Sequence, residues 1–400
     1  MASSALDRLR SIENLGTVWK TYWKDNSKSA PGVDGITPKI FNDNLNRHLR
    51  YLREEIREGY TYSALRVIPI EKKNSIKKRL ICIPTVADRL VQRAVLKNIE
   101  SKSMALGIIN EVSFGFVKET SEIKRGVHAA RKAAVRLRQE YPWAFKADIS
   151  AFFDTIQRED LIQRFKKSFR LTSVEPLVRG AINCEIDNSD PAIRRILYDN
   201  GIKEGIGLRQ GMPLSPILSN FVLRDFDKAF GNRGYQLVRY ADDLLVLAGS
   251  MEECKRIEDF TISELGRLDL KVSEAKTETC SPTEPVEFLG MELGLRPGTE
   301  KYCLTVSDLQ MKKIEEAFVR YHDWVVAQNE GLDVAKLFRR LEQMKSGYGT
   351  AYSAADNIAD LNIRLKQSVQ NCATTIYNSI FGVGAVQKLD MKKRAFLMLP

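Results

Sequence analysis

The segment Leu237 to Gly249 reads LVRYADDLLVLAG and places two adjacent aspartates, Asp242 and Asp243, between two short apolar runs. Apolar runs of this length, rich in branched residues, predict two β-strands joined as a hairpin. Neighbouring carboxylates in such a hairpin repel each other and lose hydration when they are partly buried. A divalent cation would offset that cost. The alternative is a polar hairpin turn that holds two acids by chance.

The composition narrows the class of partner. The chain has 400 residues, of which 44% are hydrophobic, enough for a substantial core and two or three sub-domains. Its net charge of +11 favours a polyanionic partner, nucleic acid before membrane. The sequence has no apolar signal core and no run long enough to span a membrane. Its six scattered cysteines argue against a zinc module and a disulfide framework, so we expect a soluble protein of a reducing cytoplasm, with no membrane partner.

A third aspartate lies in Ala144–Ile156, AFKADISAFFDTI, where Asp148 follows a short apolar strand. An acid at the end of a strand can ligate a metal, although a lone one is more often a cap or turn residue. Asp148 and the Asp242–Asp243 pair could together bind two Mg²⁺ ions, which clamp the attacking and leaving oxygens of a phosphoryl displacement. Magnesium suits such a site because it takes carboxylates while keeping positions for water and substrate phosphates.

Another candidate stretch is Gly205–Asn220, GIGLRQGMPLSPILSN, which leads into an apolar helix. Its glycines Gly207 and Gly211 would let the backbone approach a ligand closely, and the side chain of Gln210 can both donate and accept. The alternative is an ordinary junction between a loop and a helix.

Basic residues gather in EKKNSIKKR, between strands predicted at Leu65–Ile70 and Leu80–Ile83. Such a hairpin tip is usually a solvated edge that blocks aggregation, and the alternative here is a hairpin that closes over phosphates. A helix is predicted over Pro84–Glu100, and its polar face, expected to be solvated, carries Arg89, Gln92, Arg93 and Lys97.

The remaining patterns place the other elements. A helix is predicted over Leu45–Glu58, closed by Gly59. Leu268–Thr277 and Val286–Leu293 look like further strands of the aspartate-bearing sheet. The turn-rich Gly294–Glu300 is the expected domain boundary, and Ser307 begins a capping box that opens an all-α C-terminal region.

Taken in order, these motifs resemble those of reverse transcriptases, closest to the group II intron-like bacterial family. The likeness runs from about Pro31 to Leu293, more weakly beyond, and rests on PGVDGIT, RVIPIEKKNSIKKRLICIPTVADRLVQRAV, SFGFVKETS, ADISAFFDTI, GLRQGMPLSPILSN, YADD and FLGMEL. YADD alone is a weak match, whereas seven motifs in order are highly specific.

The resemblance implies an α+β fold of the right-hand polymerase type, with fingers, an antiparallel palm sheet and an all-α thumb. Residues 1–30 would be an N-terminal helical extension and residues 31–146 the fingers with part of the palm. Residues 147–294 would form the palm with the catalytic aspartates, and residues 295–400 the thumb.

The resemblance also implies roles for single residues. The catalytic and metal-binding set would be Asp148, Asp242 and Asp243, with the backbone of Ile149, around two Mg²⁺ ions for which Mn²⁺ can substitute. Residues that bind the incoming dNTP would be Lys72, Arg79, Phe153, Gln210 and Lys276. Phe153 stands at the steric-gate position, where its ring would clash with a ribose 2′-hydroxyl. Template and primer contacts would come from Gly211, Pro213, Tyr240, Phe288, Leu289 and Gly290.

The partners implied are an RNA template, a DNA product strand and dNTPs. The chain ends at Pro400 without a cysteine-rich endonuclease, no retron VTG follows Gly290, and Gln210-Gly211 replaces the serine-glutamine of diversity-generating enzymes. These features favour a stand-alone bacterial enzyme that copies a dedicated structured non-coding RNA in antiphage defence. One alternative is a maturase that binds and folds intron RNA. An RNA-dependent RNA polymerase is a third option, and Phe153 argues against it.

Overall fold

The computed structural model describes residues 4–71, 77–120, 124–169, 173–384 and 388–396. These residues group into two compact units. The first contains Met1–Gly126, Phe145–Val246 and Lys255–Glu278, and the second contains Val127–Ala144, Leu247–Cys254 and Thr279–Pro400. Within the described part of the chain, no helix combines the length and the apolarity needed to cross a bilayer.

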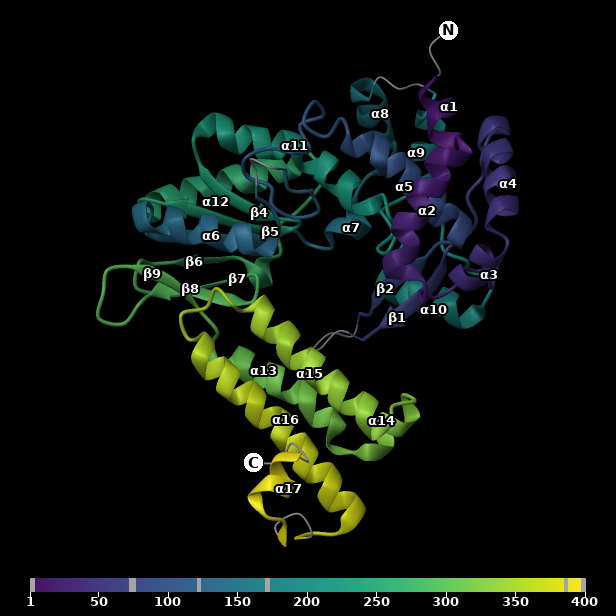
Figure 1. Cartoon of the computed structure of the whole chain (residues 1–400). Helices are drawn as coiled ribbons and strands as arrows, with labels where there is room; N and C mark the ends of the chain where they lie inside the picture. The colour runs from purple at the N-terminus through teal and green to yellow at the C-terminus, as the bar shows by residue number, and fades with distance from the viewer. Residues whose placement is uncertain (1–3, 72–76, 121–123, 170–172, 385–387, 397–400) are drawn as a thin grey trace. The chain divides into compact units, whose positions relative to one another are not determined.

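The N-terminal part of the first unit is helical, with α1 (Ala5–Arg10), α2 (Ile12–Asn26), α3 (Pro38–Asp43), α4 (Leu45–Glu58) and α5 (Val86–Glu100). Serine side chains cap the first two helices: Ser4 accepts from the N–H of Asp7, and Ser11 from that of Asn14. The predicted bounds of α4 are confirmed, and Gly59 closes it in the left-handed region, at φ 116°. Helix α2 packs against α4 and α5 and buries Trp19 almost completely (Figure 1).

The polar face of α5 corrects an expectation, because most of it is not solvated. Arg89 is only 7% exposed and Gln92 is fully buried. The guanidinium of Arg89 donates to the carbonyls of Pro84 and Ala30, to the hydroxyl of Tyr22 and to that of Ser29. These residues bury the polar face of α5 against the chain that follows α2, an arrangement that helical spacing alone does not reveal.

Two sheets follow, and several strands of the second one cross the boundary between the two units along the chain. β1 (Arg66–Ile70) pairs with β2 (Arg79–Ile83) as the predicted antiparallel hairpin. The second sheet has the order β4-β5-β3-β6, from β3 (Trp143–Asp148), β4 (Gln236–Tyr240), β5 (Asp243–Ala248) and β6 (Glu278–Cys280). The helices that accompany them are α7 (Phe152–Thr155), α8 (Arg158–Ser168), α9 (Glu175–Ile182), α10 (Pro191–Asn200), α11 (Ser215–Arg233) and α12 (Met251–Gly266).

Two predicted strands of the aspartate-bearing sheet are wrong. Leu268–Thr277 is a loop with one isolated bridge, between Val272 and Ile149, and a short 3₁₀ helix, η1 (Glu274–Lys276). Val286–Leu293 is divided between β7 (Val286–Phe288) and β8 (Met291–Leu295), which pair in a different sheet, of order β7-β8-β9. The apolar spacing identifies extended chain but does not say which strand it pairs with.

The second unit combines the three-stranded antiparallel sheet with the C-terminal helices. After β9 (Tyr302–Thr305) come α13 (Asp308–Val319), η2 (Arg320–His322), α14 (Trp324–Asn329), α15 (Val334–Ala351), α16 (Ile358–Phe381) and α17 (Met391–Phe396). The helix start predicted at Ser307 is confirmed, since its side chain accepts from the N–H of Gln310. Helix α16 packs on α13 and α15 (Figure 1). The expected helical region thus begins after one further strand, β9, and the prediction of an α+β fold is confirmed.

The helix α6 (Gly126–Glu140) belongs mostly to the second unit, and two of its arginines are buried. Arg131 donates to the carbonyls of Leu289 and Ala351. Arg138 is fully buried and donates to four carbonyls, those of Pro142, Ser281, Glu284 and Leu293. These guanidiniums satisfy carbonyls that the sheet and the helix connections would otherwise leave unpaired.

Candidate active site

The turn between β4 and β5 presents the adjacent aspartates. β4 ends at Tyr240, and β5 begins at Asp243. Ala241 has φ 58°, the left-handed region that costs a residue with a Cβ about 1 kcal/mol or more. This conformation reverses the chain within two residues and leaves Asp242 at the tip of the hairpin, so something must hold it in place.

The side chain of Arg239 supplies that support. Its Nη1 donates to the carbonyl of Ala241 at 3.0 Å and to Oδ1 of Asn220 at 2.9 Å. Its Nε and Nη2 donate to the two carboxylate oxygens of Asp227, on α11, at 2.6 and 2.5 Å. Arg239 is 0% exposed and Asp227 is 2% exposed. A bidentate pair this deep fixes the direction of the guanidinium, and thereby the Ala241 carbonyl.

A loop from residues 112–116 closes over the same turn. The N–H of Phe114 donates to the Arg239 carbonyl at 2.8 Å, and Asn220 Nδ2 donates to the Gly115 carbonyl at 2.7 Å. A Cβ on Gly115 would lie 2.7 Å from the backbone nitrogen of Ala241, which leaves no room for a side chain. The SFGF motif therefore contains a glycine because the loop touches the backbone of the aspartate turn.

The third aspartate lies beside this turn. Asp148 ends β3, the neighbour of β5, and the N–H of Ile149 donates to the carbonyl of Asp242 at 3.3 Å. The Asp148 carbonyl accepts from the N–H of Ser273, and its carboxylate accepts from Lys276 Nζ at 2.8 Å. The side chain of Asp148 is 13% exposed and that of Lys276 is 62% exposed. The predicted aspartates and Lys276 thus come together in the first unit.

Their charges interact strongly. Burial, followed by the negative charge of Asp148, raises the pKa of Asp242, which Lys276 and Arg79 lower only in part. Burial and the charges of Asp242 and Asp148 raise the pKa of Asp243 from 3.8 to about 6. The hydrogen bond to Asp148 raises the pKa of Lys276. Burial and the neighbouring carboxylates thus outweigh the cations in their effect on the pKa of Asp242 and Asp243.

The raised pKa values of Asp242 and Asp243 indicate whether the site fits a divalent metal. Carboxylate oxygens are the ligands that Mg²⁺ prefers, and an excess of partly buried carboxylates is what such an ion relieves. Among the described residues, no three Asp, Glu, His or Cys side chains are gathered closely enough to coordinate an ion as they stand. Asp148 is paired with Lys276 instead. The chemistry of the donor set fits Mg²⁺, and Lys276 holds one of the two carboxylate oxygens of Asp148, Oδ2.

A cavity of about 370 Å³ opens over these residues. Its lining includes seven of the predicted site residues: Arg79, Asp148, Ile149, Phe153, Gln210, Asp242 and Lys276. Asp243 does not line the cavity and acts on it through its charge. The prediction for Lys72 falls outside the described residues.

Glycine is required at positions 207 and 211 for a reason other than close approach to a ligand. A Cβ on Gly207 would meet the backbone of Asp154 at 2.8 Å, and one on Gly211, at φ 101°, would meet the Cys82 carbonyl at 2.4 Å. The Gln210 carbonyl also accepts from the N–H of Cys82, on β2, at 2.7 Å. The described structure thus fills the space beside both glycines with protein backbone, and this packing positions the Gln210 side chain at the cavity.

Other predicted residues lie apart from the cavity lining. Tyr240 is 6.3 Å from Phe116, ring centre to ring centre, and Phe116 is 6.4 Å from Phe153. Pro213 lies in the turn before α11. Phe288, Leu289 and Gly290 belong to the second unit, where Leu289 and Gly290 form the left-handed turn between β7 and β8. Arg131 holds that turn through the Leu289 carbonyl.

Sequence reasoning missed the residues that position the site: Asp227, Arg239, Asn220, Gly115 and Phe116. A signal existed for Arg239, since a charged residue inside an apolar strand requires a buried partner. Its partner Asp227 carries no such mark, because it lies on a helix with many polar residues.

Comparison with known proteins identifies the family. Residues 70–293 match the sequence model described as "Reverse transcriptase (RNA-dependent DNA polymerase)", more than half of the 400 residues. The chain belongs to this family. It is therefore an RNA-directed DNA polymerase by family, and its α+β fold and motif order agree with that membership.

Two curated relatives are similar in sequence to this reverse transcriptase. It is 27% identical over 310 residues to Protein YkfC of Escherichia coli strain K12, covering 67% of this chain and 77% of YkfC. It is 23% identical over 355 residues to the group II intron-encoded protein LtrA of Lactococcus lactis subsp. cremoris, covering 70% of this chain and 54% of LtrA. The chain thus spans about half the length of LtrA. Among solved structures, telomerase from Candida albicans aligns with a TM-score of 0.40 at 13% identity, over 89% of this chain and 69% of that one.

Gly115→Ala tests the loop that closes over the aspartate turn. Because the new Cβ would lie 2.7 Å from the Ala241 nitrogen, we expect the turn to shift and nucleotide incorporation to fall at least tenfold. Gly231→Ala, on α11 with no atom within 4 Å of the new Cβ, is the matched control and should leave incorporation unchanged. Equal activity of the two variants in steady-state assays would show that the loop does not position the aspartates.

Asp243→Asn tests the charge crowding through stability. A raised pKa means that the folded state binds the proton more tightly than the unfolded state, so the free energy of unfolding falls as pH rises from about 4 through about 6. We expect the variant, measured without divalent metal, to be more stable than wild type by about 2 kcal/mol near pH 8. This gain should largely vanish near pH 4. Urea unfolding at both pH values measures it, and a gain independent of pH would contradict the assignment.

Proposed function

We propose that this reverse transcriptase extends the 3′ end of a primer with dNTPs on an RNA template, using Asp148, Asp242 and Asp243 to hold two Mg²⁺ ions. Ions bound there would neutralise the charge that develops on the transferred phosphoryl group and orient its attacking and leaving oxygens. The observation that carries the proposal is the cavity that joins the cation of Arg79, the acids Asp148 and Asp242, and the ring of Phe153.

Each lining residue has a part that its chemistry suits. Arg79 at the end of the β1–β2 hairpin would bind the triphosphate, together with Lys276 once it leaves Asp148. Gln210 would contact the nascent base pair, from a loop pinned to β2 through the Cys82 N–H. Phe153 would exclude a ribose 2′-hydroxyl, and its ring is supported at 5.5 Å by the ring of Phe152.

Primer contacts are proposed for the second unit and for Tyr240. The Leu289-Gly290 turn has two consecutive residues at positive φ, the shape that lets a two-residue loop match the twist of its flanking strands. Arg131 fixes this turn from α6. Phe288 is almost fully buried and would anchor the hairpin rather than contact nucleic acid.

Asp242→Ala and Asp243→Ala test the assignment of the carboxylates. Each should reduce metal-dependent dNTP incorporation by a factor of about 10³ or more, because the transition-state charge loses its counterion. Affinity for an RNA–DNA primer–template should stay within about twofold, since phosphate contacts dominate it. Asp225→Ala, which removes an exposed aspartate on α11, is the control. Retained incorporation in both active-site variants would refute the proposal.

Phe153→Ala tests the choice of sugar. Removing the ring opens the space where a 2′-hydroxyl would lie, so the preference for dNTPs over rNTPs should fall by about tenfold or more in kcat/KM. Phe153→Tyr keeps the ring and should keep the preference. The gate assignment fails if wild type already uses rNTPs as well as dNTPs.

For the template we propose a partner non-coding RNA, in a bacterial antiphage system. The motif differences around Gln210 and after Gly290 favour this role. The second candidate is an intron maturase, which the similarity to the intron-encoded LtrA favours. RNA that copurifies with the protein distinguishes the two. One RNA with complementary DNA that disappears in Asp242→Ala indicates a dedicated template, whereas spliced intron RNA indicates a maturase.

A further inference from the structure

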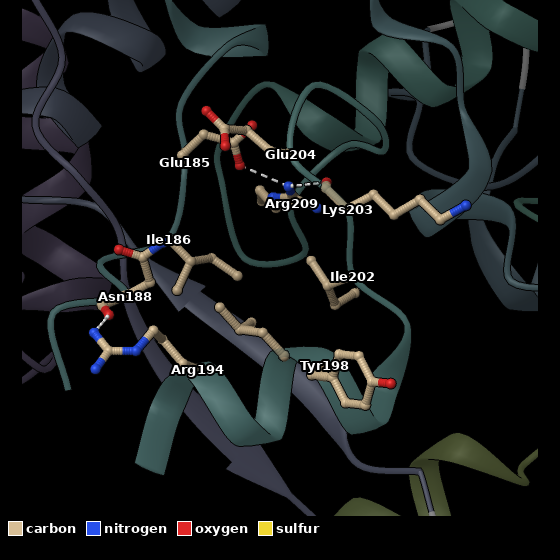
Figure 2. Close-up of a pocket in the computed structure, with 10 residues that line it drawn as sticks. Glu185, Ile186, Asn188, Arg194, Tyr198, Ile202, Lys203, Glu204 and Arg209 are labelled. Carbon is tan, nitrogen blue, oxygen red and sulfur yellow. Dashed lines mark hydrogen bonds and ion pairs between the residues drawn. The ribbon is translucent and has the colours of Figure 1, made fainter. Parts of the chain in front are cut away.

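A second cavity, of about 480 Å³, lies in the first unit outside the set of proposed catalytic residues. Its volume falls within the roughly 300–1,000 Å³ typical of small-ligand sites. Helix α10 forms one side and the segments around Glu185 and Arg209 the other (Figure 2). The lining residues are Glu185, Ile186, Asn188, Arg194, Leu197, Tyr198, Ile202, Lys203, Glu204 and Arg209.

One end of this cavity holds a buried charge cluster. The carboxylate of Glu185 accepts from Arg158 Nη1 at 2.6 Å, from Arg209 Nη2 at 2.6 Å and from the Gly205 N–H at 2.8 Å. The side chains of the two arginines are only 3% and 4% exposed. Burial on its own would raise the pKa of Glu185, and these three hydrogen bonds together lower it. The carboxylate is therefore ionised, and the cluster sets two buried guanidiniums against one acid.

The cluster is also incompletely hydrogen-bonded. Arg209 Nη2 has a second acceptor, the Lys203 carbonyl, at 2.9 Å. Arg209 Nε and Nη1 are buried and have no partner among the described residues. A buried guanidinium with unpaired N–H groups is costly, and an anion that enters the cavity and accepts from them reduces this cost.

The other end carries an exposed aromatic ring. Tyr198 on α10 is 81% exposed, and Arg194 lies on the same helix, one turn earlier. Figure 2 shows both on the opposite side of the cavity from Glu185 and Arg209, with the aliphatic side chains of Ile186 and Ile202 between them. An exposed tyrosine beside cations is the combination on which single-stranded nucleic acids stack.

The second cavity adjoins the catalytic one through shared residues. Ile202 lines both cavities, and Arg209 directly precedes Gln210, which lines the catalytic one. The last residue of α10, Asn200, accepts from the N–H of Lys78 at 2.8 Å and also lines the catalytic cavity. One loop, residues 200–211, therefore borders the proposed catalytic cavity and the second cavity.

We propose that the second cavity binds an unpaired nucleotide of the template strand, ahead of the base that pairs with the incoming dNTP. The base stacks on Tyr198, beside Arg194 and against the aliphatic wall, and the phosphate faces the Arg209 end of the cavity. The site is selective for single strands because a paired base cannot enter the cavity. This assignment rests on the proposed function, since it needs a template that passes Gln210.

The test compares primer–templates whose template strands have a short or a long 5′ overhang. Binding is measured by fluorescence anisotropy without metal or dNTPs, so that it is independent of catalysis. With about six unpaired nucleotides instead of one, wild type should bind about tenfold more tightly, the worth of a stacked base. Tyr198→Ala should lose this gain and bind both substrates alike. Tyr51→Ala, which removes another exposed tyrosine on α4, is the matched control and should keep it.

Other outcomes overturn the proposal. An equal gain in Tyr198→Ala and wild type excludes the subsite while leaving the polymerase assignment intact. A wild type that binds neither primer–template refutes the proposed function, and the subsite with it. Cytidine monophosphate is the probe for a free nucleotide. If it binds in a Tyr198-dependent manner while overhang length has no effect, the cavity is a mononucleotide site and not a template subsite.

Discussion

The ion pair between Arg239 and Asp227 is the interaction on which the geometry of the aspartate turn depends. It is fully buried, and removing one partner of such a pair typically costs about 3–5 kcal/mol, because the other charge stays unpaired. The same guanidinium also donates to the Ala241 carbonyl and so favours the left-handed shape of the turn. This contact offsets the strain at Ala241 and helps to fix the backbone that carries Asp242.

A rigid turn is needed because the neighbouring carboxylates at this turn repel each other. Burial, followed by neighbouring carboxylates, raises the pKa of Asp242 and of Asp243, and a flexible loop would relieve this by moving the carboxylates apart or protonating them. The hydrogen bond from the Ile149 N–H to the Asp242 carbonyl joins β3 to the turn and so opposes the separation of the carboxylates. The charge of Lys276 opposes protonation of the carboxylates. Because the Lys276 side chain is 62% exposed, it can separate from Asp148 without unfolding the protein. The fold fixes the acids and leaves their counterion free to exchange.

The sequence predicts what short-range chemistry determines. Gly59 ends α4 and Ser307 begins α13 because each makes its own local bond, and the aspartate hairpin follows from two apolar runs around one turn. Prediction from the sequence fails where strand pairing or burial depends on a segment that is distant in the chain. Residues 286–293 pair in a sheet of their own, and Arg89 is buried by the chain after α2. The same holds for the candidate site. The order of the sequence motifs predicted the aspartates, whereas the role of Asp227 is evident only from its contact with Arg239 in the structure.

Segment 200–211 extends this logic from the catalytic cavity to its neighbour. It is tied to the β1–β2 hairpin at two points, Asn200 to Lys78 and the Gln210 carbonyl to Cys82. Gly211 permits the second tie, since any side chain there would strike the Cys82 carbonyl. Between these ties, Arg209 shares the carboxylate of Glu185 with Arg158. Arg209 lines one cavity and the next residue, Gln210, lines the other. One short segment, held at both ends, therefore forms part of the wall of each cavity.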